Sequence, residues 1–159
     1  MSALENATVR RVRAALESLG LGHEVVALER SCRTAADAAR AVGCEVGQIV
    51  KSLVFKLEHT NRALLVLTSG ANRVDEARLS TLVGESIGKA DADFVREQTG
   101  FAIGGVAPIG HARRLATLID QDLLAWPEIW AAAGHPNTVF RLVPQDLVRM
   151  TGGRVVAVT

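Results

Sequence analysis

The chain has 159 residues, of which 48% are hydrophobic, 22% charged and 4% aromatic, and its 18 basic and 17 acidic side chains give a net charge of +1. At this length about 70% of the unfolded chain's surface can be buried, so we expect a single domain over residues 1–159 that completes its core without a disulfide or a metal. Ordinary apolar content and low net charge exclude wholesale disorder.

The sequence also limits the expected compartment and partners. No run reaches the roughly 18 consecutive apolar residues of a membrane span, and residues 1–6 lack the charged-then-apolar order of a signal peptide. We therefore expect a cytoplasmic protein with no membrane partner. Proteins that grip a long nucleic-acid backbone usually carry a strong positive excess. We expect no DNA partner, and any RNA contact should be small or confined to one basic patch.

Helical spacing marks the N-terminal region. Apolar residues recur at Val9, Val12, Leu16 and Leu19. This pattern, followed by a glycine, predicts an amphipathic helix over residues 5–19. A strand is predicted over residues 23–28, and then a short alanine-rich helix over 35–42, capped by Thr34 and closed by Gly43.

The middle of the chain is rich in β-forming residues. Residues 49–57 and 63–68 predict two strands, and the polar turn 58–61 between them indicates a hairpin. Asp75 is a suitable cap for a helix that continues to residue 83. Asp91 or Asp93 then begins another helix, which ends near a glycine at position 100.

The C-terminal third contains short strands and one more helix. Strands are predicted over residues 116–119 and 138–142, a helix from Pro144 to about residue 150, and a last strand over 154–158. Helices and strands interleave, and the hairpin argues against a purely parallel sheet. We predict an α+β fold with a mixed central sheet flanked by helices.

Lys51 interrupts an otherwise apolar strand. Because side chains alternate along a strand, Lys51, Leu53 and Phe55 share one face. The commoner explanation is an edge-strand lysine whose stem covers apolar surface while its ammonium reaches water. The alternative is a cation at a pocket mouth, where it could hold a phosphate or hydroxyl or stabilise developing negative charge.

Residues 99–111 contain four glycines and one proline. Glycine permits unusual backbone angles and lets a ligand approach the main chain, while Pro108 stiffens the far end. Inward-pointing N–H groups of such a loop could polarise an ester carbonyl, as an oxyanion hole does. The segment fits neither a GxxxxGK[ST] phosphate loop nor GxGxxG spacing. A structural turn and a ligand site are both compatible with the pattern.

Other candidates are weaker. His135, in the turn before residues 138–142, could contact substrate, although a surface turn histidine is commoner. The remaining histidines show no metal-ligand spacing, and we expect no metal; they are His23, His59 and His111. Neither Ser52 nor Ser69 lies in a GxSxG motif. Cys32 and Cys44 are interpreted as free packing thiols.

The aromatic and basic clusters have two explanations each. Residues 126–130 are interpreted as the start of a packed helix beside the alanines 131–133, with a binding platform as the alternative. Three arginines on the first helix favour a solvated face over contact with a transfer-RNA backbone; they are Arg10, Arg11 and Arg13.

Three motifs resemble the YbaK/EbsC family of free-standing relatives of the editing domain inserted in bacterial prolyl-tRNA synthetases. They are IVKSLVFK at 49–56, NRVD at 72–75, and TGF at 99–101 followed by GGVAPIG at 104–110. The resemblance extends from the first helix to the last strand and is most specific in the lysine strand and the glycine loop. It implies the editing-domain fold of that family.

The resemblance implies a trans-editing deacylase, which hydrolyses the ester joining a wrong amino acid to the 3′ end of a transfer RNA. The expected substrate is the proline acceptor carrying Ala, Cys or Ser, with no cofactor. Lys51 matches the family's main catalytic or substrate-positioning lysine. The loop that contacts the aminoacyl group through its backbone matches Gly104, Gly105, Val106, Ala107 and Pro108. His135 matches a turn that lines the amino-acid pocket in some members.

This chemistry agrees with the residue inventory, because an aminoacyl ester is already activated. Its hydrolysis needs an oriented water and a polarised carbonyl, which positioning and electrostatics can supply. A synthetase or an elongation factor is a candidate helper protein. The alternatives are a non-catalytic module that senses an amino-acid-like ligand or docks on a synthetase, and a general esterase.

Overall fold

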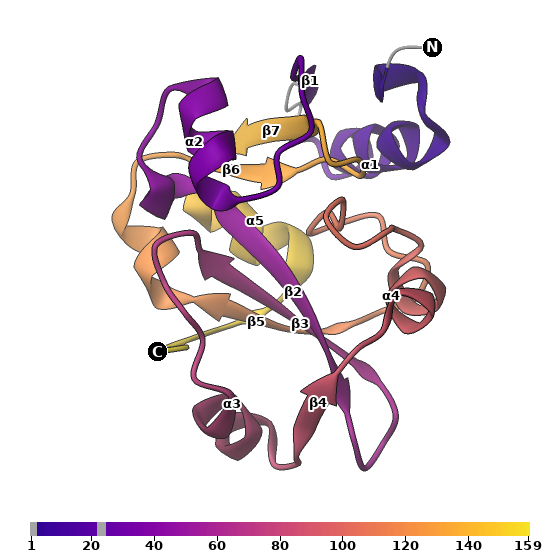
Figure 1. Cartoon of the computed structure of the whole chain (residues 1–159), viewed down its shortest axis with the longest axis vertical. Coiled ribbons are helices and arrows are strands. Elements are labelled where there is room, and N and C mark those ends of the chain that lie inside the picture. The colour runs from indigo at the N-terminus through magenta and orange to yellow at the C-terminus, as the bar shows by residue number, and fades with distance from the viewer. Residues whose placement is uncertain (1–2, 22–24) are drawn as a thin grey trace.

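The computed structural model describes residues 3–21 and 25–159 (Figure 1). Five strands form a mixed sheet, namely β2 Val50–Leu57, β3 Ala63–Ser69, β4 Ile87–Lys89, β5 Ala116–Asp120 and β8 Arg154–Val156. Their order is β4-β2-β3-β5-β8. Strand β2 is antiparallel to β3 and β4, whereas β3, β5 and β8 run parallel. The predicted hairpin and the mixed sheet are confirmed.

A second sheet accompanies the first. It contains β1 Val25–Ala27, β6 Ile129–Ala132 and β7 Thr138–Leu142 in the order β1-β7-β6, and all of its pairs are antiparallel. The strand predicted over residues 23–28 corresponds to β1, although residues 22–24 lie outside the described ranges. The sequence did not predict that these strands separate from the central sheet.

The helices begin and end close to the predicted residues. They are α1 Ala7–Ser18, α2 Ala35–Val42, α3 Glu76–Val83, α4 Ala92–Thr99 and α5 Pro144–Thr151. Thr34 Oγ1 accepts a hydrogen bond from Asp37 N at the start of α2, and Asp91, not Asp93, caps α4. Within the described ranges, no helix is long and apolar enough to cross a bilayer.

The helix predicted to start at residues 126–130 is wrong. Residues 129–132 form β6, where Ala131 pairs with Phe140 and Ala132 with Val139. Burial alternates along this strand, since Ile129 and Ala131 are buried and their neighbours are only half-buried. Alanine favours helices by less than 1 kcal/mol per residue, so pairing with β7 outweighs the local preference. Strand β4 was also missed, because two of its three residues, Gly88 and Lys89, are of types that strands disfavour.

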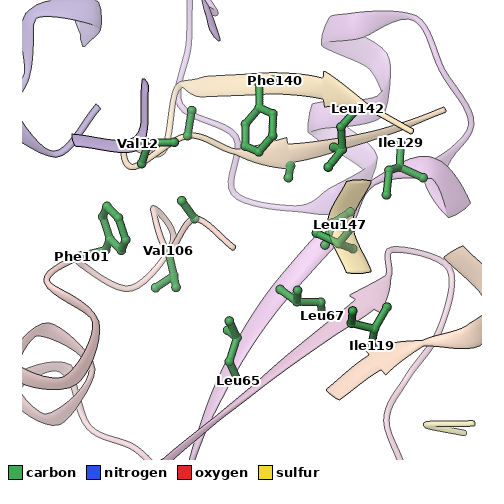
Figure 2. Close-up of a cluster of buried hydrophobic side chains, with 14 of the residues drawn as sticks. Val12, Leu65, Leu67, Phe101, Val106, Ile119, Ile129, Phe140, Leu142 and Leu147 are labelled. Carbon is green, nitrogen blue, oxygen red and sulfur yellow. The ribbon is translucent and has the colours of Figure 1, made fainter. Parts of the chain in front are cut away.

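The main hydrophobic core lies between the two sheets (Figure 2). It contains Val12 of α1, Leu65 and Leu67 of β3, Phe140 of β7, Leu147 of α5, and Phe101 and Val106 of the loop after α4. Burying a side chain of this size stabilises the fold by about 1.5–3 kcal/mol. Phe101 and Val106 therefore hold the glycine-rich segment against the core at two points. Helix α3 packs on the opposite face of the five-stranded sheet.

Candidate functional site

A cavity of about 650 Å³ lies between the two sheets. Consecutive residues 50–53 of β2 line it, and so do consecutive residues 130–132 of β6. Strand β4 pairs only with residues 55–57 of β2, so the β2 backbone at 50–53 has no strand on the side away from β3. An isolated bridge between Ile49 and Trp130 joins the two strand edges. The cavity is therefore a gap between two sheet edges, whose backbone groups can bind a ligand.

Small and apolar side chains form most of the remaining wall. They come from α2, from the 3-10 helix before β2 and from the second sheet, and include Ala35, Ala38, Val42, Val46, Ile49, Ala131, Ala132 and Val139. Few of these side chains can donate or accept hydrogen bonds. This part of the cavity suits a small, apolar group.

Lys51 is half-buried on the cavity wall. It is the second residue of β2 and pairs with Thr68 of β3. Its face is the one that carries Leu53 and Phe55, as the alternation predicted. Lys51 Nζ donates a hydrogen bond to the backbone oxygen of Asn72 at 2.7 Å. The edge-strand explanation is thus correct in part, but this edge faces the cavity and the ammonium is held by the protein.

A buried carboxylate lies behind Asn72. Asp120, at the end of β5, is 1% exposed. Its Oδ2 accepts hydrogen bonds from Thr68 Oγ1 at 2.9 Å, Ser69 N at 3.0 Å and Asn72 Nδ2 at 2.8 Å. These bonds satisfy the buried charge and fix the Asn72 side chain. The Asn72 carbonyl in turn fixes the Lys51 ammonium.

Asn72 and Asp120 were not among the candidate residues predicted from the sequence. Asn72 lies in the NRVD motif at 72–75, and Asp120 directly follows the apolar run 116–119. A charged residue that ends a buried strand is rarely left without partners. That signal could have selected Asp120, but nothing local indicates that its partner is 48 positions away.

The predicted glycine-loop residues 104–108 do not all lie at the cavity. Gly104, at φ +90°, and Val106 line the cavity with Lys51. The N–H of Gly105 donates to Ala102 O at 3.0 Å, and a Cβ built on Gly105 would lie 3.1 Å from His135 Cα. The loop therefore approaches the neighbouring turn closely at Gly105.

The other two loop residues lie away from the cavity. Ala107 is fully buried, and its carbonyl oxygen lies 2.6 Å from His111 Nε2. Pro108 lines a separate hollow near the start of β5. Among the described residues, the N–H groups of Gly104 and Val106 have no hydrogen-bond acceptor in the protein. Within the predicted segment 104–108, these two residues therefore bring unused backbone donors to the cavity wall, which Ile103 also lines.

His135 lies beside the cavity and does not line it. It lines a hollow of about 260 Å³ together with Gly105, and this hollow shares Pro136 with the cavity. Its Nδ1 accepts a hydrogen bond from Asn137 N at 3.3 Å. Since Nδ1 is occupied in this way, the ring helps to shape the turn after β6.

Two cavity residues were not selected from the sequence as site residues. Ser52 Oγ is buried and has no hydrogen-bond partner in the part of the chain that the structure describes. An unsatisfied buried hydroxyl costs about 1–3 kcal/mol, which a ligand can offset. Burial, and then the Asp37 carboxylate, raise the pKa of the Cys32 thiol, so it is protonated at neutral pH. Both cysteines are free, as predicted.

One of the three N-terminal arginines braces the loop. The Arg11 guanidinium lies 4.6 Å from the centre of the Phe101 ring and donates to Thr99 O at 3.5 Å. The His111 ring meets Phe101 edge-on at 5.9 Å. Burial, with a smaller effect of Arg11, lowers the pKa of His111. In residues 3–21 and 25–159, no group of His, Cys, Asp or Glu side chains is arranged to hold a metal ion.

Comparisons with known proteins show the family to which this fold belongs. The family model of the aminoacyl-tRNA editing domain matches residues 29–150, and the chain belongs to this family. A crystal structure described as a candidate trans-editing enzyme for prolyl tRNA synthetase is 49% identical, with a TM-score of 0.91, and the match covers 97% of this chain and 98% of that one. The resemblance predicted from the lysine strand and the glycine loop is confirmed.

Two curated relatives extend the comparison. EbsC of Enterococcus faecalis, named as a candidate Cys-tRNA(Pro)/Cys-tRNA(Cys) deacylase, is 24% identical over 127 residues, or 79% of this chain and 77% of EbsC. Proline–tRNA ligase of Bacillus licheniformis is 32% identical over 109 residues, or 68% of this chain but 18% of the ligase. The second match therefore concerns only a part of a larger enzyme.

Proposed function

We propose that this chain is a trans-editing deacylase that hydrolyses the ester between a small non-cognate amino acid and the 3′ end of the proline transfer RNA. The observation that carries the proposal is one cavity lined by Lys51, Gly104 and Val106. A lysine and two loop residues with unused backbone donors thus border one space of about 650 Å³. The names of the crystal-structure relative and of EbsC support the same activity.

In this proposal each group has a defined task. The Lys51 ammonium, held by the Asn72 carbonyl, binds the terminal nucleotide through its hydroxyls or phosphate. The amides of Gly104 and Val106 bind the carbonyl oxygen and stabilise the negative charge that develops when water adds to the ester. The bond to the ribose oxygen then breaks, and that oxygen takes a proton. Positioning and electrostatics suffice, so the proposed reaction uses no metal or cofactor.

The alanine-rich wall accounts for selectivity. Ala35, Ala38, Ala131 and Ala132 line the cavity, and in this proposal they border the subsite for a side chain of the size of Ala, Cys or Ser. A pocket that is too small excludes a larger cognate ring by steric clash, whereas one missing methylene changes binding by only about 1–3 kcal/mol. Enlarging this subsite would therefore not improve discrimination between small amino acids and proline. Filling it with larger side chains would remove activity on small amino acids.

The test is a deacylation panel with labelled Ala-, Cys-, Ser- and Pro-tRNA(Pro). We expect loss of label from one or more of the small non-cognate esters, slower loss from Pro-tRNA(Pro), and the same rates with EDTA. Lys51→Ala should lower the rate at least tenfold, as loss of a charge-stabilising donor usually does. Lys56→Ala is the matched control, because Lys56 lies on the same strand but its ammonium is over the Phe94 ring, 5.5 Å from its centre.

The panel also separates the alternatives. A non-catalytic module would release amino acid equally slowly with wild type and Lys51→Ala, and that result would refute the catalytic proposal. A general esterase would hydrolyse small activated esters as fast as aminoacyl-tRNA. The match to proline–tRNA ligase makes a synthetase the first partner to test by adding it to the assay, followed by an elongation factor. Charged transfer RNA is used in the cytoplasm, which is the proposed location.

A further inference from the structure

A second hollow adjoins the cavity. It is about 940 Å³ in volume and is lined by residues 27–33 together with Asp37, Arg40 and Ala41. It shares Cys32 and Arg33 with the cavity. If the aminoacyl end of a substrate occupies the cavity, the rest of the bound molecule must extend out through an opening of this kind, because it is far larger than the cavity.

The charges of this hollow suit a polyanion. Arg30 and Arg33 are exposed, and neither has a carboxylate within ion-pair distance in the part of the chain that is described. Arg40 is different, since its Nη2 lies 2.6 Å from Asp37 Oδ1, and that pair is neutral. Glu29 also lines the hollow. The guanidinium groups of Arg30 and Arg33 are thus available to bind phosphate oxygens, which they match in geometry and charge.

The segment that carries these arginines is held in place by the second sheet. Leu28 N donates to Asn137 O at 2.7 Å, and Cys32 N donates to Pro136 O at 3.1 Å. Both bonds go to the turn between β6 and β7. The backbone on either side of Arg30 is therefore fixed before a ligand arrives, which lowers the entropic cost of binding.

A second opening exists but is less suitable. The hollow of about 260 Å³ beside His135 contains one arginine, Arg96, and shares only Pro136 with the cavity. It is smaller than the 940 Å³ hollow and carries one guanidinium, whereas the larger hollow carries two that have no ion-pair partner among residues 3–21 and 25–159. Arg96 therefore serves as a matched control at the other exit.

We propose that residues 28–33 form a docking surface for the phosphodiester backbone of the single-stranded acceptor end, with Arg30 and Arg33 each contacting a phosphate. This inference rests on the proposed function, because it assumes that the ester lies in the cavity. It also reconciles the net charge of +1 with a nucleic-acid substrate, since the contact is local.

The test measures salt dependence. Binding of uncharged proline transfer RNA is followed by fluorescence anisotropy from 50 to 300 mM KCl for wild type, Arg30→Ala/Arg33→Ala and Arg96→Ala. For single strands the slope of log affinity against log salt changes by about 0.7 per phosphate contact, so the double variant should lose about 1.4 of slope. Arg96→Ala should keep the wild-type slope. A wild-type slope in the double variant, or an equal loss in Arg96→Ala, would overturn the proposal.

A turnover arm separates this surface from the proposed function. The substrates are Ala-tRNA(Pro) and alanyl-adenosine, which carries the ester but no phosphodiester. The double variant should lose more kcat/KM on the transfer RNA than on alanyl-adenosine, whereas equal losses would contradict a phosphate contact. If wild type binds the transfer RNA with the expected slope but hydrolyses neither ester, the deacylase proposal fails and the docking surface stands.

Discussion

Replacing Asn72 by alanine tests whether the buried carboxylate controls the lysine. Asn72→Ala removes the Nδ2 donor that joins Asp120 and Asp122 at 2.8 Å each, but leaves the backbone carbonyl that accepts from Lys51 Nζ. Thr68 and Ser69 still satisfy the Asp120 carboxylate. The substitution therefore loosens the loop after β3 without leaving the buried charge unpaired.

The expected effects follow from these contacts. A hydrogen bond to a charged group contributes about 1.5–3 kcal/mol, and the Asp122 bond adds little because that carboxylate is exposed. We expect a loss of about 2 kcal/mol, which lowers Tm by roughly 4–8 °C for a chain of this size. Misplacing a reacting group by about 1 Å costs up to about 100-fold in rate. We expect kcat to fall about 10–100-fold, while KM changes less.

The assay is the deacylation of Ala-tRNA(Pro) at several concentrations, together with thermal unfolding. The control is Glu85→Ala, which removes another carboxylate that anchors a loop, since Glu85 Oε1 accepts from the amides of His59 and Thr60. That anchor lies in the turn between β2 and β3, at the opposite end of β2 from Lys51. If Asn72→Ala keeps the wild-type kcat while Tm falls, the network is structural only and the reasoning is refuted.

Two further substitutions probe the loop. Gly105→Val should lower the stability by about 1–3 kcal/mol through overpacking, because its Cβ would meet His135 Cα at 3.1 Å; a wild-type Tm with lost turnover would instead mean that a ligand approaches Gly105. For His111, the lowered pKa means that the unfolded chain takes up the proton first. Its stabilising contribution is complete above the ordinary pKa of about 6.5 and is lost as pH falls from there through the folded pKa. His111→Gln should therefore reduce the Tm difference between pH 7.5 and pH 5, and an unchanged difference would show that other groups cause it.

Helix ends and the hairpin were predictable because their signals are local. Thr34 and Asp91 cap helices through residues three positions away, and the alternation around Lys51 follows from strand geometry alone. The lysine strand and the glycine loop were also sufficient to indicate the family. Local signals also misled the prediction near residues 126–130. The alanines that follow prefer helix locally, but pairing with a distant strand overrides that preference.

The sequence by itself therefore located the five α-helices, apart from one helix wrongly predicted near residues 126–130, and showed that a lysine strand and a glycine loop coexist in one chain. Only the tertiary structure decided that the free edges of β2 and β6 lie side by side with a cavity between them, and that Gly104 and Val106, but not Gly105 or Pro108, line it with Lys51. It also decided that Asp120 reaches Asn72. Caps and periodicity act over a few residues, whereas these contacts join residues about 50 or more positions apart and depend on how whole strands pack.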